Sequence, residues 1–139
     1  VAARVATLGL DRAQLHGDEL ATAFEGLGKS VLIRAVRVWD EKTFSAEPAW
    51  EPGLWLYDAF TTAYGGSGAQ APWPLIARHG RRPFLLAGGL TPDNVAAGIA
   101  AVRPDGVDVA SGVESAPGRK DATRLRRFIE AARAASREL

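Results

Sequence analysis

The sequence predicts an α/β fold in which parallel strands are covered by helices. Short apolar runs alternate with helix-forming segments along the chain, which is typical of parallel strands joined by crossover helices. Polar or glycine residues follow these runs, and ligands bind at the carboxyl ends of the strands in parallel α/β folds. Residues of this kind are His16, Asp58, Gly88-Gly89 and Ser111-Gly112.

The most informative stretch covers residues 84–94. Its first four residues, Phe-Leu-Leu-Ala, form the short apolar run of a strand buried on both faces. Gly88 and Gly89 follow, and then Thr91 can cap a helix whose first position is Pro92. Backbone N–H groups gather at such a turn and, with the helix dipole, favour an anion such as phosphate. The alternative is a tight turn that needs glycine only for its backbone angles.

The other elements can be taken in chain order. Apolar residues near helical spacing predict a first helix over 1–8, ended by Gly9. Arg34 and Arg37 interrupt the second strand and need a partner, an edge or solvent. Prolines allow at most two helical turns near 40–46. Strands are expected over 13–16, 31–38, 54–57, 84–88 and 106–110; helices are expected over 19–27, 73–79, 91–102 and 122–137; a loop is expected over 111–120.

Two aspartates are predicted to cap helices. Asp18 would cap the helix over 19–27, and Asp121 would cap the last one. The last helix is amphipathic, with arginines on one face. Its core-facing residues are expected to be Leu125, Phe128, Ile129 and Ala132.

Composition limits the possible functions. The 139 residues suffice for one domain, and 17 basic against 16 acidic residues give no reason to expect nucleic acid or a membrane as a partner. No apolar run reaches the ~18 residues of a membrane span. Cysteine is absent and only two histidines are present, so we expect no disulfide, no metal and no cofactor. A cytoplasmic location is the expectation.

Three titratable residues are candidates for chemistry. Asp58 directly follows a strand, where partial burial would raise the pKa of its carboxyl and suit it to general acid catalysis; the alternative is a loop cap. Asp108 alternates with two valines and is expected to face a cavity, because a buried carboxylate without a partner is costly. His16 could meet a substrate, although a histidine at a strand end is more often structural.

Two further segments could contact a ligand. The run Gly65-Gly66-Ser67-Gly68 is flexible enough for a lid, with a plain flexible loop as the alternative. Ser111 and Gly112 could add a hydroxyl and an N–H to the anion site begun at Gly88 and Gly89.

Several motifs occur along the chain in a fixed order. They are Gln-Leu-His-Gly-Asp-Glu at 14–19, Asp58, the glycine run 65–68, Trp73, Leu-Ala-Gly-Gly-Leu-Thr-Pro-Asp-Asn-Val at 86–95, Gly-Val-Asp-Val-Ala-Ser-Gly-Val-Glu at 106–114, Pro117-Gly118 and Lys120-Asp121. Together, and in this order, they resemble phosphoribosylanthranilate isomerase of tryptophan biosynthesis. The resemblance covers nearly the whole chain, and its last two long motifs are specific.

The resemblance implies a TIM (β/α)8 barrel, of which residues 1–139 form a single partial domain with strands four to eight and without strands one to three. It implies an Amadori rearrangement of a small phosphorylated substrate, N-(5-phosphoribosyl)anthranilate. Asp58 would be the general acid. The phosphate would lie at Gly88, Gly89, Ser111 and Gly112, Asp108 and His16 would line the cavity, and residues Gly65 to Gly68 would form the lid.

The sequence departs from the family in three places. The family's general base is a cysteine after strand one, and its substrate-binding arginine follows strand two; this chain has neither strand and no cysteine. Ala71-Pro72-Trp73 replaces the usual Phe-Asp-Trp. We therefore expect no turnover by this chain alone.

Other classes of function stay open. One is another phosphate-binding barrel enzyme, such as a sugar-phosphate epimerase or indole-glycerol-phosphate synthase. The other is a non-catalytic half-barrel that binds phosphate, whose open sheet would leave two strand edges free for self-association.

Overall fold

The chain forms a five-stranded parallel sheet with helices packed on one face. The computed structural model describes residues 1–16, 19–45, 50–59 and 72–138. The strands lie side by side in chain order, each parallel to the next, which confirms the predicted parallel α/β fold. They are β1 (Ala13–Leu15), β2 (Leu32–Arg37), β3 (Leu54–Asp58), β4 (Phe84–Ala87) and β5 (Gly106–Val107).

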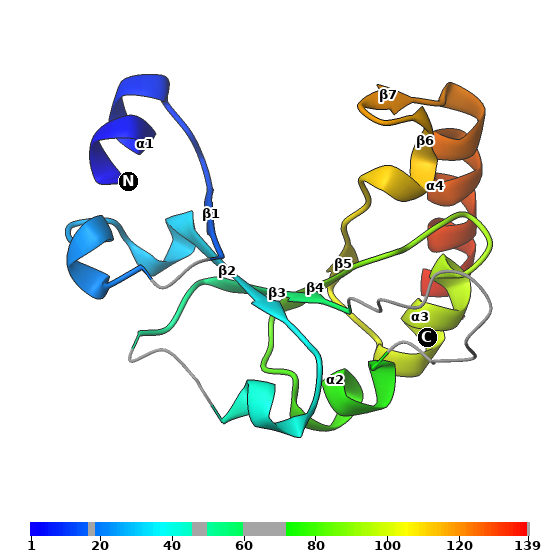
Figure 1. Ribbon diagram of the computed structural model, residues 1–139, viewed down its shortest axis with the longest axis horizontal. Helices are drawn as coiled ribbons and strands as arrows, with labels where there is room; N and C mark the ends of the chain where they lie inside the picture. The colour runs from blue at the N-terminus through cyan, green and yellow to red at the C-terminus, as the bar shows by residue number, and fades with distance from the viewer. Residues whose placement is uncertain (17–18, 46–49, 60–71, 139) are drawn as a thin grey trace.

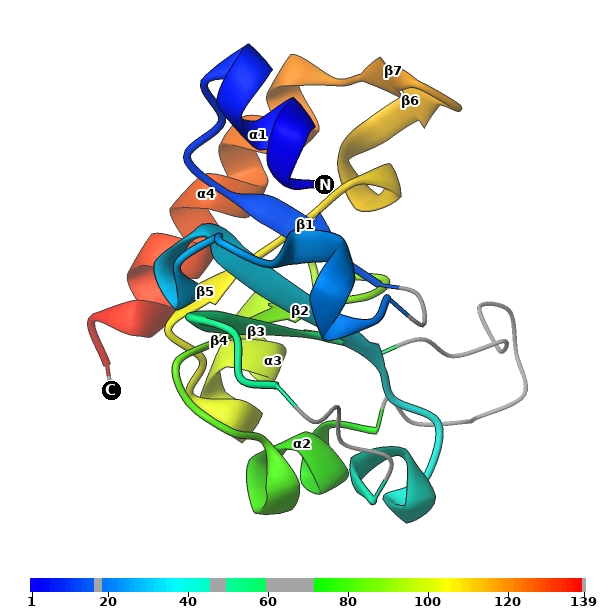
Figure 2. The same cartoon turned by 90° about the vertical axis from the view of Figure 1, so that its left-hand side faces the viewer.

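The helices cover one face and leave the other open. In Figure 1, α2 (Trp73–His79) and α3 (Val95–Val102) lie below the sheet, and the space above it separates two arms. One arm carries α1 (Ala2–Leu8). The other carries the hairpin of β6 (Glu114–Ala116) and β7 (Arg119–Lys120), followed by α4 (Ala122–Ser136). Figure 2 shows the same sheet from the side.

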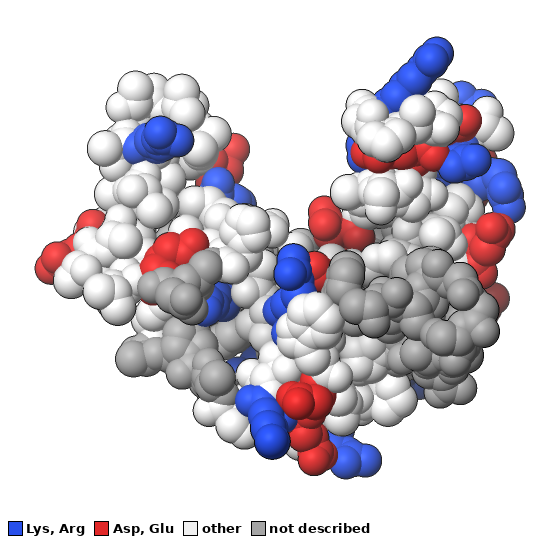
Figure 3. All heavy atoms as spheres, in the orientation of Figure 1, with Lys and Arg blue, Asp and Glu red and all other residues white. Residues whose placement is uncertain are grey.

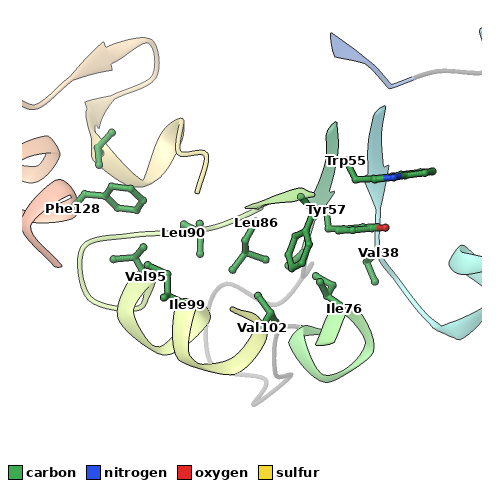
Figure 4. Packing of buried hydrophobic residues seen from close by; sticks show 13 residues of the cluster. Val38, Trp55, Tyr57, Ile76, Leu86, Leu90, Val95, Ile99, Val102 and Phe128 are labelled. Atoms are coloured by element: carbon green, nitrogen blue, oxygen red, sulfur yellow. The ribbon is translucent and has the colours of Figure 1, made fainter. Parts of the chain in front are cut away.

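Residue alternation along the strands builds the core. Trp55 and Tyr57 of β3, with Phe84 and Leu86 of β4, point toward the helices and are almost fully buried. Figure 4 shows Tyr57 and Leu86 facing side chains of α2 and α3, which include Ile76, Val95, Ile99 and Val102, while Phe128 of α4 lies at the other end of the cluster. A smaller cluster joins Leu15, Phe24 and Leu32 at the β1 end. The helices therefore fix one face of the sheet, and the carboxyl ends of the strands stay accessible on the other.

Tyr57 also makes a polar contact at the edge of the core. Its hydroxyl accepts a hydrogen bond from the backbone N–H of Arg81 at 2.8 Å, which holds the loop between α2 and β4. Replacing Tyr57 by Phe keeps the ring and removes the bond, so the free energy of unfolding should fall by about 1 kcal/mol. Urea denaturation of both proteins measures this difference. An unchanged midpoint with an unchanged slope would show that the bond does not stabilise the fold.

The predicted helix over 19–27 is wrong. The described part of this segment contains only the 3₁₀ helix Ala21–Phe24. Phe24 packs onto Leu15 and Leu32, and Gly26 follows with a φ of 85°, a conformation that interrupts a right-handed helix. The predicted cap at Asp18 lies outside the described residues.

The segment after β4 also differs from the prediction. Helix α3 begins at Val95 and not at Thr91, because side chains build a separate turn before it. The Asn94 Oδ1 accepts from the Thr91 N–H at 2.8 Å, and the Thr91 Oγ1 accepts from the Asp93 N–H at 3.3 Å. Such local bonds compete with helical ones.

The C-terminal part is more ordered than predicted. Strand β5 ends at Val107, and the expected loop over 111–120 contains the 3₁₀ helix Ser111–Val113 and the β6–β7 hairpin. Asp121 caps α4 as predicted, because its side chain accepts from the Arg124 N–H at 2.9 Å. Phe128 is buried as expected, but Leu125 and Ile129 are 38% and 41% exposed, so they do not face the core.

Helices of the described segments are too short or too polar to cross a membrane.

Candidate active site

A pocket of about 820 Å³ opens at the carboxyl ends of the parallel strands. Its wall is contributed by β1 to β4, by the turn after β4 and by residues 108–112 after β5. Figure 3 shows the hollow between the two arms on the open side of the sheet. This is the place where parallel α/β folds bind ligands, and the pocket lies at the strand ends where the sequence predicts a site.

The pleat of the sheet decides which side chains reach the pocket. On β2, Ala35 and Arg37 line it, and on β3, Leu56 and Asp58 do. Arg37 and Asp58 are register partners on neighbouring strands, so their side chains leave the sheet on the same face. Residues between them, such as Tyr57, point into the core. The site and the core are thus built by alternate residues of the same strands.

Asp58 is the carboxyl group at the centre of the pocket wall. Its side chain is 30% exposed, and its Oδ2 lies 3.8 Å from the Nε of Arg37. Its Oδ1 is buried and has no hydrogen-bond partner among the described residues. Burial raises the pKa of the Asp58 carboxyl above its usual value; the Arg37 guanidinium lowers this pKa, and the negative charge of Asp108 raises it. The net increase keeps more of the carboxyl protonated, as a general acid requires.

The turn after β4 lies directly against Asp58. Gly88 has a φ of 85°, and a Cβ on it would stand 2.3 Å from the Asp58 Oδ1, so no other residue fits without displacement. The Asn94 side chain fixes the turn by donating to the Gly89 carbonyl at 3.0 Å. Gly88 and Gly89 therefore bring backbone, and no side chain, to the pocket wall.

The second glycine-containing turn meets the first. Ser111 and Gly112 line the pocket, and a Cβ on Gly112 would lie 1.7 Å from the Leu90 carbonyl oxygen. The two backbone segments therefore pack directly on each other. This close approach is what a shared anion site on the two turns needs.

Asp108 and His16 also line the pocket. Asp108 lies one residue beyond β5, and its N–H still donates to the Leu86 carbonyl at 2.9 Å, which continues the pairing with β4. The structure thus brings together His16, Asp58, Gly88, Gly89, Asp108, Ser111 and Gly112 around one cavity.

The lining residues that were not singled out from the sequence as site residues include three with a long polar or aromatic side chain. They are Gln14, Arg37 and Trp39. The sequence pattern that could have indicated these residues is the alternation of side chains along β1 and β2. This alternation puts Gln14 on the same face as His16, and Arg37 on the same face as Ala35. The sequence alone does not give the register that pairs Arg37 with Asp58.

The predicted lid, Gly65 to Gly68, lies outside the described residues. Among the residues that are described, no cluster of three or more histidine or acidic side chains is arranged to hold a metal ion.

The chain has the fold of a parallel α/β protein, and its pocket lies at the carboxyl edge of the sheet, where proteins of this class bind small ligands. Comparison with known proteins then defines the family. The chain belongs to the N-(5'-phosphoribosyl)anthranilate (PRA) isomerase family, whose model matches residues 1–131.

Individual relatives agree with this assignment. The N-(5'-phosphoribosyl)anthranilate isomerase of Magnetococcus marinus is 44% identical over 137 residues, which are 97% of this chain and 65% of the relative. The crystal structure of the Thermotoga maritima phosphoribosyl anthranilate isomerase superimposes with a TM-score of 0.76 at 36% identity, covering 94% of this chain and 65% of that one. Another isomerase structure, in complex with reduced 1-(o-carboxyphenylamino)-1-deoxyribulose 5-phosphate, gives a TM-score of 0.71 at 32% identity, covering 94% and 63%. The chain therefore spans less than two thirds of the length of these relatives.

Proposed function

We propose that this chain supplies the general acid and the phosphate site of a PRA isomerase of tryptophan biosynthesis. The reaction converts N-(5-phosphoribosyl)anthranilate to 1-(2-carboxyphenylamino)-1-deoxyribulose 5-phosphate. One observation carries the proposal: the Asp58 carboxyl, with its raised pKa and its buried, unpartnered Oδ1, faces a pocket whose next wall is built by two glycine-containing turns.

Each part of the pocket has a role in the proposed chemistry. Asp58 gives its proton to the ring oxygen of the ribose, the C1–O bond breaks, and the nitrogen lone pair stabilises the resulting iminium at C1. A base then removes the C2 proton to form the enolamine. The enolamine becomes the ketose when C1 gains a proton and the C2 hydroxyl loses its proton. The 139 residues contain no cysteine, so we propose that the base of the family lies outside them.

The remaining site residues are assigned by position. The backbone of Gly88, Gly89, Ser111 and Gly112 would hold the phosphate, because glycine-containing turns pack together at this part of the pocket wall and turns of this kind bind anions. Asp108 and His16 would contact the sugar from opposite ends of the pocket wall. The glycine run at 65–68 would close over the bound substrate.

We also propose that the parallel sheet is part of a (β/α)8 barrel and that it represents strands four to eight, in one domain. The support is the likeness to isomerase structures that are longer than this chain. Among the described residues, β1 and β5 are each paired on one side only, so the isolated chain should self-associate through these edges. Light scattering during size-exclusion chromatography measures the mass. The enzyme of such a pathway would work in the cytoplasm.

The test of the proposed function is turnover by a completed protein. The 139 residues are joined behind the N-terminal part of the Magnetococcus marinus relative, up to the residue that aligns with the start of this chain; we call this protein the extended enzyme. We expect it to form the ketose from N-(5-phosphoribosyl)anthranilate, and product is measured by chromatography. The reduced product analogue, reduced 1-(o-carboxyphenylamino)-1-deoxyribulose 5-phosphate, tests binding separately from turnover. If the folded extended enzyme bound this analogue but formed no product, the function would be binding of a phosphorylated ligand without catalysis. The absence of cysteine favours that alternative.

The activity should depend on pH through Asp58. A general acid works in its protonated form, so kcat/KM should fall as the pH rises through the pKa of Asp58. The charges that face this carboxyl in the pocket wall are Arg37 on β2 and Asp108 after β5, and His16 lies farther along the wall on the β1 side. Replacing Arg37 by Gln removes the positive charge that lowers the pKa, and the falling limb should move to higher pH. A limb that stays in place in the Gln variant, or that moves to lower pH, would mean that another group titrates.

A further inference from the structure

We propose that Lys120 is a positioning residue of the phosphate site: its ammonium joins the two ends of the segment 110–114 and holds the Ser111–Gly112 turn in its phosphate-binding shape. The inference rests on the proposed function and deepens it, because it explains what orders one of the two phosphate turns. Glu114, Gly118 and Lys120 belong to the sequence motifs, yet they are not among the described residues that line the pocket.

The Lys120 ammonium makes one hydrogen bond on each side of the turn. Its Nζ donates to the Ala110 carbonyl at 2.8 Å and to the Glu114 Oε1 at 2.8 Å. The donor is charged in both bonds, and such bonds are stronger than neutral ones. Ser111 and Gly112 lie between the two bonded residues and line the pocket. We call this pair of bonds the Lys120 clamp; it acts on the turn from outside the pocket.

The bond to Ala110 fixes the direction of a backbone N–H in the turn. The Ala110 carbonyl and the Ser111 N–H belong to one planar trans peptide unit, so they point in opposite directions. Because Lys120 holds the carbonyl from outside the pocket, the Ser111 N–H is turned away from the ammonium. This N–H is therefore the donor to phosphate whose direction depends most directly on the Lys120 clamp.

The β6–β7 hairpin holds Lys120 next to its partner. Glu114 and Lys120 are register partners on the two strands, so their side chains are neighbours. The Glu114 side chain is only 17% exposed, and its Oε2 accepts from the Gly118 N–H at 3.2 Å. The hydrogen bonds from Lys120 and from Gly118 lower the pKa of the Glu114 carboxyl, so it stays ionised and attracts Lys120 at neutral pH.

The base of the hairpin is in turn anchored to α4 and to the core. The Arg124 side chain donates to the Glu114 carbonyl, and the Asp121 N–H donates to the Val113 carbonyl at 2.8 Å. Val113 itself is buried in the main hydrophobic cluster. Figure 1 shows the hairpin and α4 on the same arm of the molecule. The Lys120 clamp therefore connects the turn to an anchored part of the fold.

The test separates positioning of the turn from simple attraction between charges. Lys120→Met removes both bonds, and Glu114→Ala leaves the ammonium without its carboxylate partner. Positioning predicts that both variants raise the Kd of the reduced product analogue, measured by calorimetry, about 3–10-fold; the effect is moderate because Lys120 is 49% exposed. The double variant should bind about as weakly as the weaker single one, because both changes remove the same clamp. Tighter binding by Glu114→Ala would show attraction by charge alone and would overturn the proposal.

Kinetics, a conservative variant and a matched control complete the design. In the extended enzyme, Lys120→Met should raise KM by a similar factor and leave kcat within about twofold, because Asp58 is untouched. Lys120→Arg keeps a charged donor and should recover most of the affinity. Arg119→Met is the control: Arg119 precedes Lys120 on β7, so its side chain leaves the opposite face of the hairpin, and the variant loses the same charge but keeps the Lys120 clamp. An unchanged Kd in Lys120→Met, or an equal loss in Arg119→Met, would overturn the positioning role.

Hydrogen exchange measured by NMR on the ligand-free chain gives a second readout. The Val113 N–H closes the turn on the Ala110 carbonyl at 3.5 Å, and it should exchange faster in Lys120→Met while the amides of α3 keep their rates. An unchanged rate at Val113 would show that Lys120 does not order the turn. Failure of the unmodified chain and of the extended enzyme to bind the analogue would instead overturn the proposed function, and with it the role of Lys120 in phosphate binding.

Discussion

Replacing Asp58 by Asn in the extended enzyme is expected to lower kcat by at least ~10²-fold, because the amide keeps the shape of the carboxyl but cannot deliver a proton. KM should change little, since the phosphate is held by other residues. The burial that raises the pKa of Asp58 is unaltered in the variant, so the difference reports the proton itself. Steady-state kinetics with N-(5-phosphoribosyl)anthranilate measures both constants.

The control for this variant is Asp11→Asn, which removes one exposed carboxylate outside the pocket and should leave kcat unchanged. If Asp58→Asn kept more than about a tenth of the kcat, well above what loss of a general acid allows, Asp58 would be a structural residue of the turn and the acid would be another group. In the 139-residue chain alone we expect no turnover with either residue.

Replacing Gly112 by Ala is expected to abolish the phosphate site. The new Cβ would lie 1.7 Å from the Leu90 carbonyl oxygen, a backbone atom that cannot rotate away, so the two turns must separate. Affinity for the reduced product analogue should fall at least ~10-fold, and overpacking should lower the free energy of unfolding by about 1–3 kcal/mol. Calorimetry and urea denaturation measure the two effects on the same protein.

Gly28→Ala is the matched control, because its Cβ would make only an ordinary contact, 3.7 Å from the Ser30 Oγ, away from the pocket. It should bind the analogue like the unmodified protein. Normal affinity in Gly112→Ala would show that the phosphate does not depend on the contact between the two turns.

The sequence predicted the sheet better than its covering helices. The apolar runs at 54–57 and 84–87 and their turn residues were sufficient to place β3 and β4, because both strands are buried on the helix side and end in distinct residues. The helix expected over 19–27 failed because Phe24 is held by Leu15 and Leu32, contacts between segments that local propensity does not include. Leu125 and Ile129 were assigned to the core from spacing alone, yet the surface of α4 that carries them has no described neighbour to bury it.

The parts of the candidate site that could be predicted from the sequence are those at which the residue type alone is informative. Asp58 after a strand and the glycines after β4 and β5 are recognisable from the sequence alone, and the structure places them around one cavity. Arg37 could not be assigned to the pocket from the sequence, because its place beside Asp58 depends on the register of β2 and β3. The roles of all these residues remain predictions to be measured.

The most direct test of the account is a crystal structure of the chain with reduced 1-(o-carboxyphenylamino)-1-deoxyribulose 5-phosphate. The account predicts the phosphate at the packed turns of Gly88-Gly89 and Ser111-Gly112, within about 3 Å of their backbone nitrogens. The sugar-derived chain should pass the Asp58 carboxyl. A phosphate bound elsewhere, or a ligand whose sugar lies beyond hydrogen-bond reach of Asp58, would contradict the account.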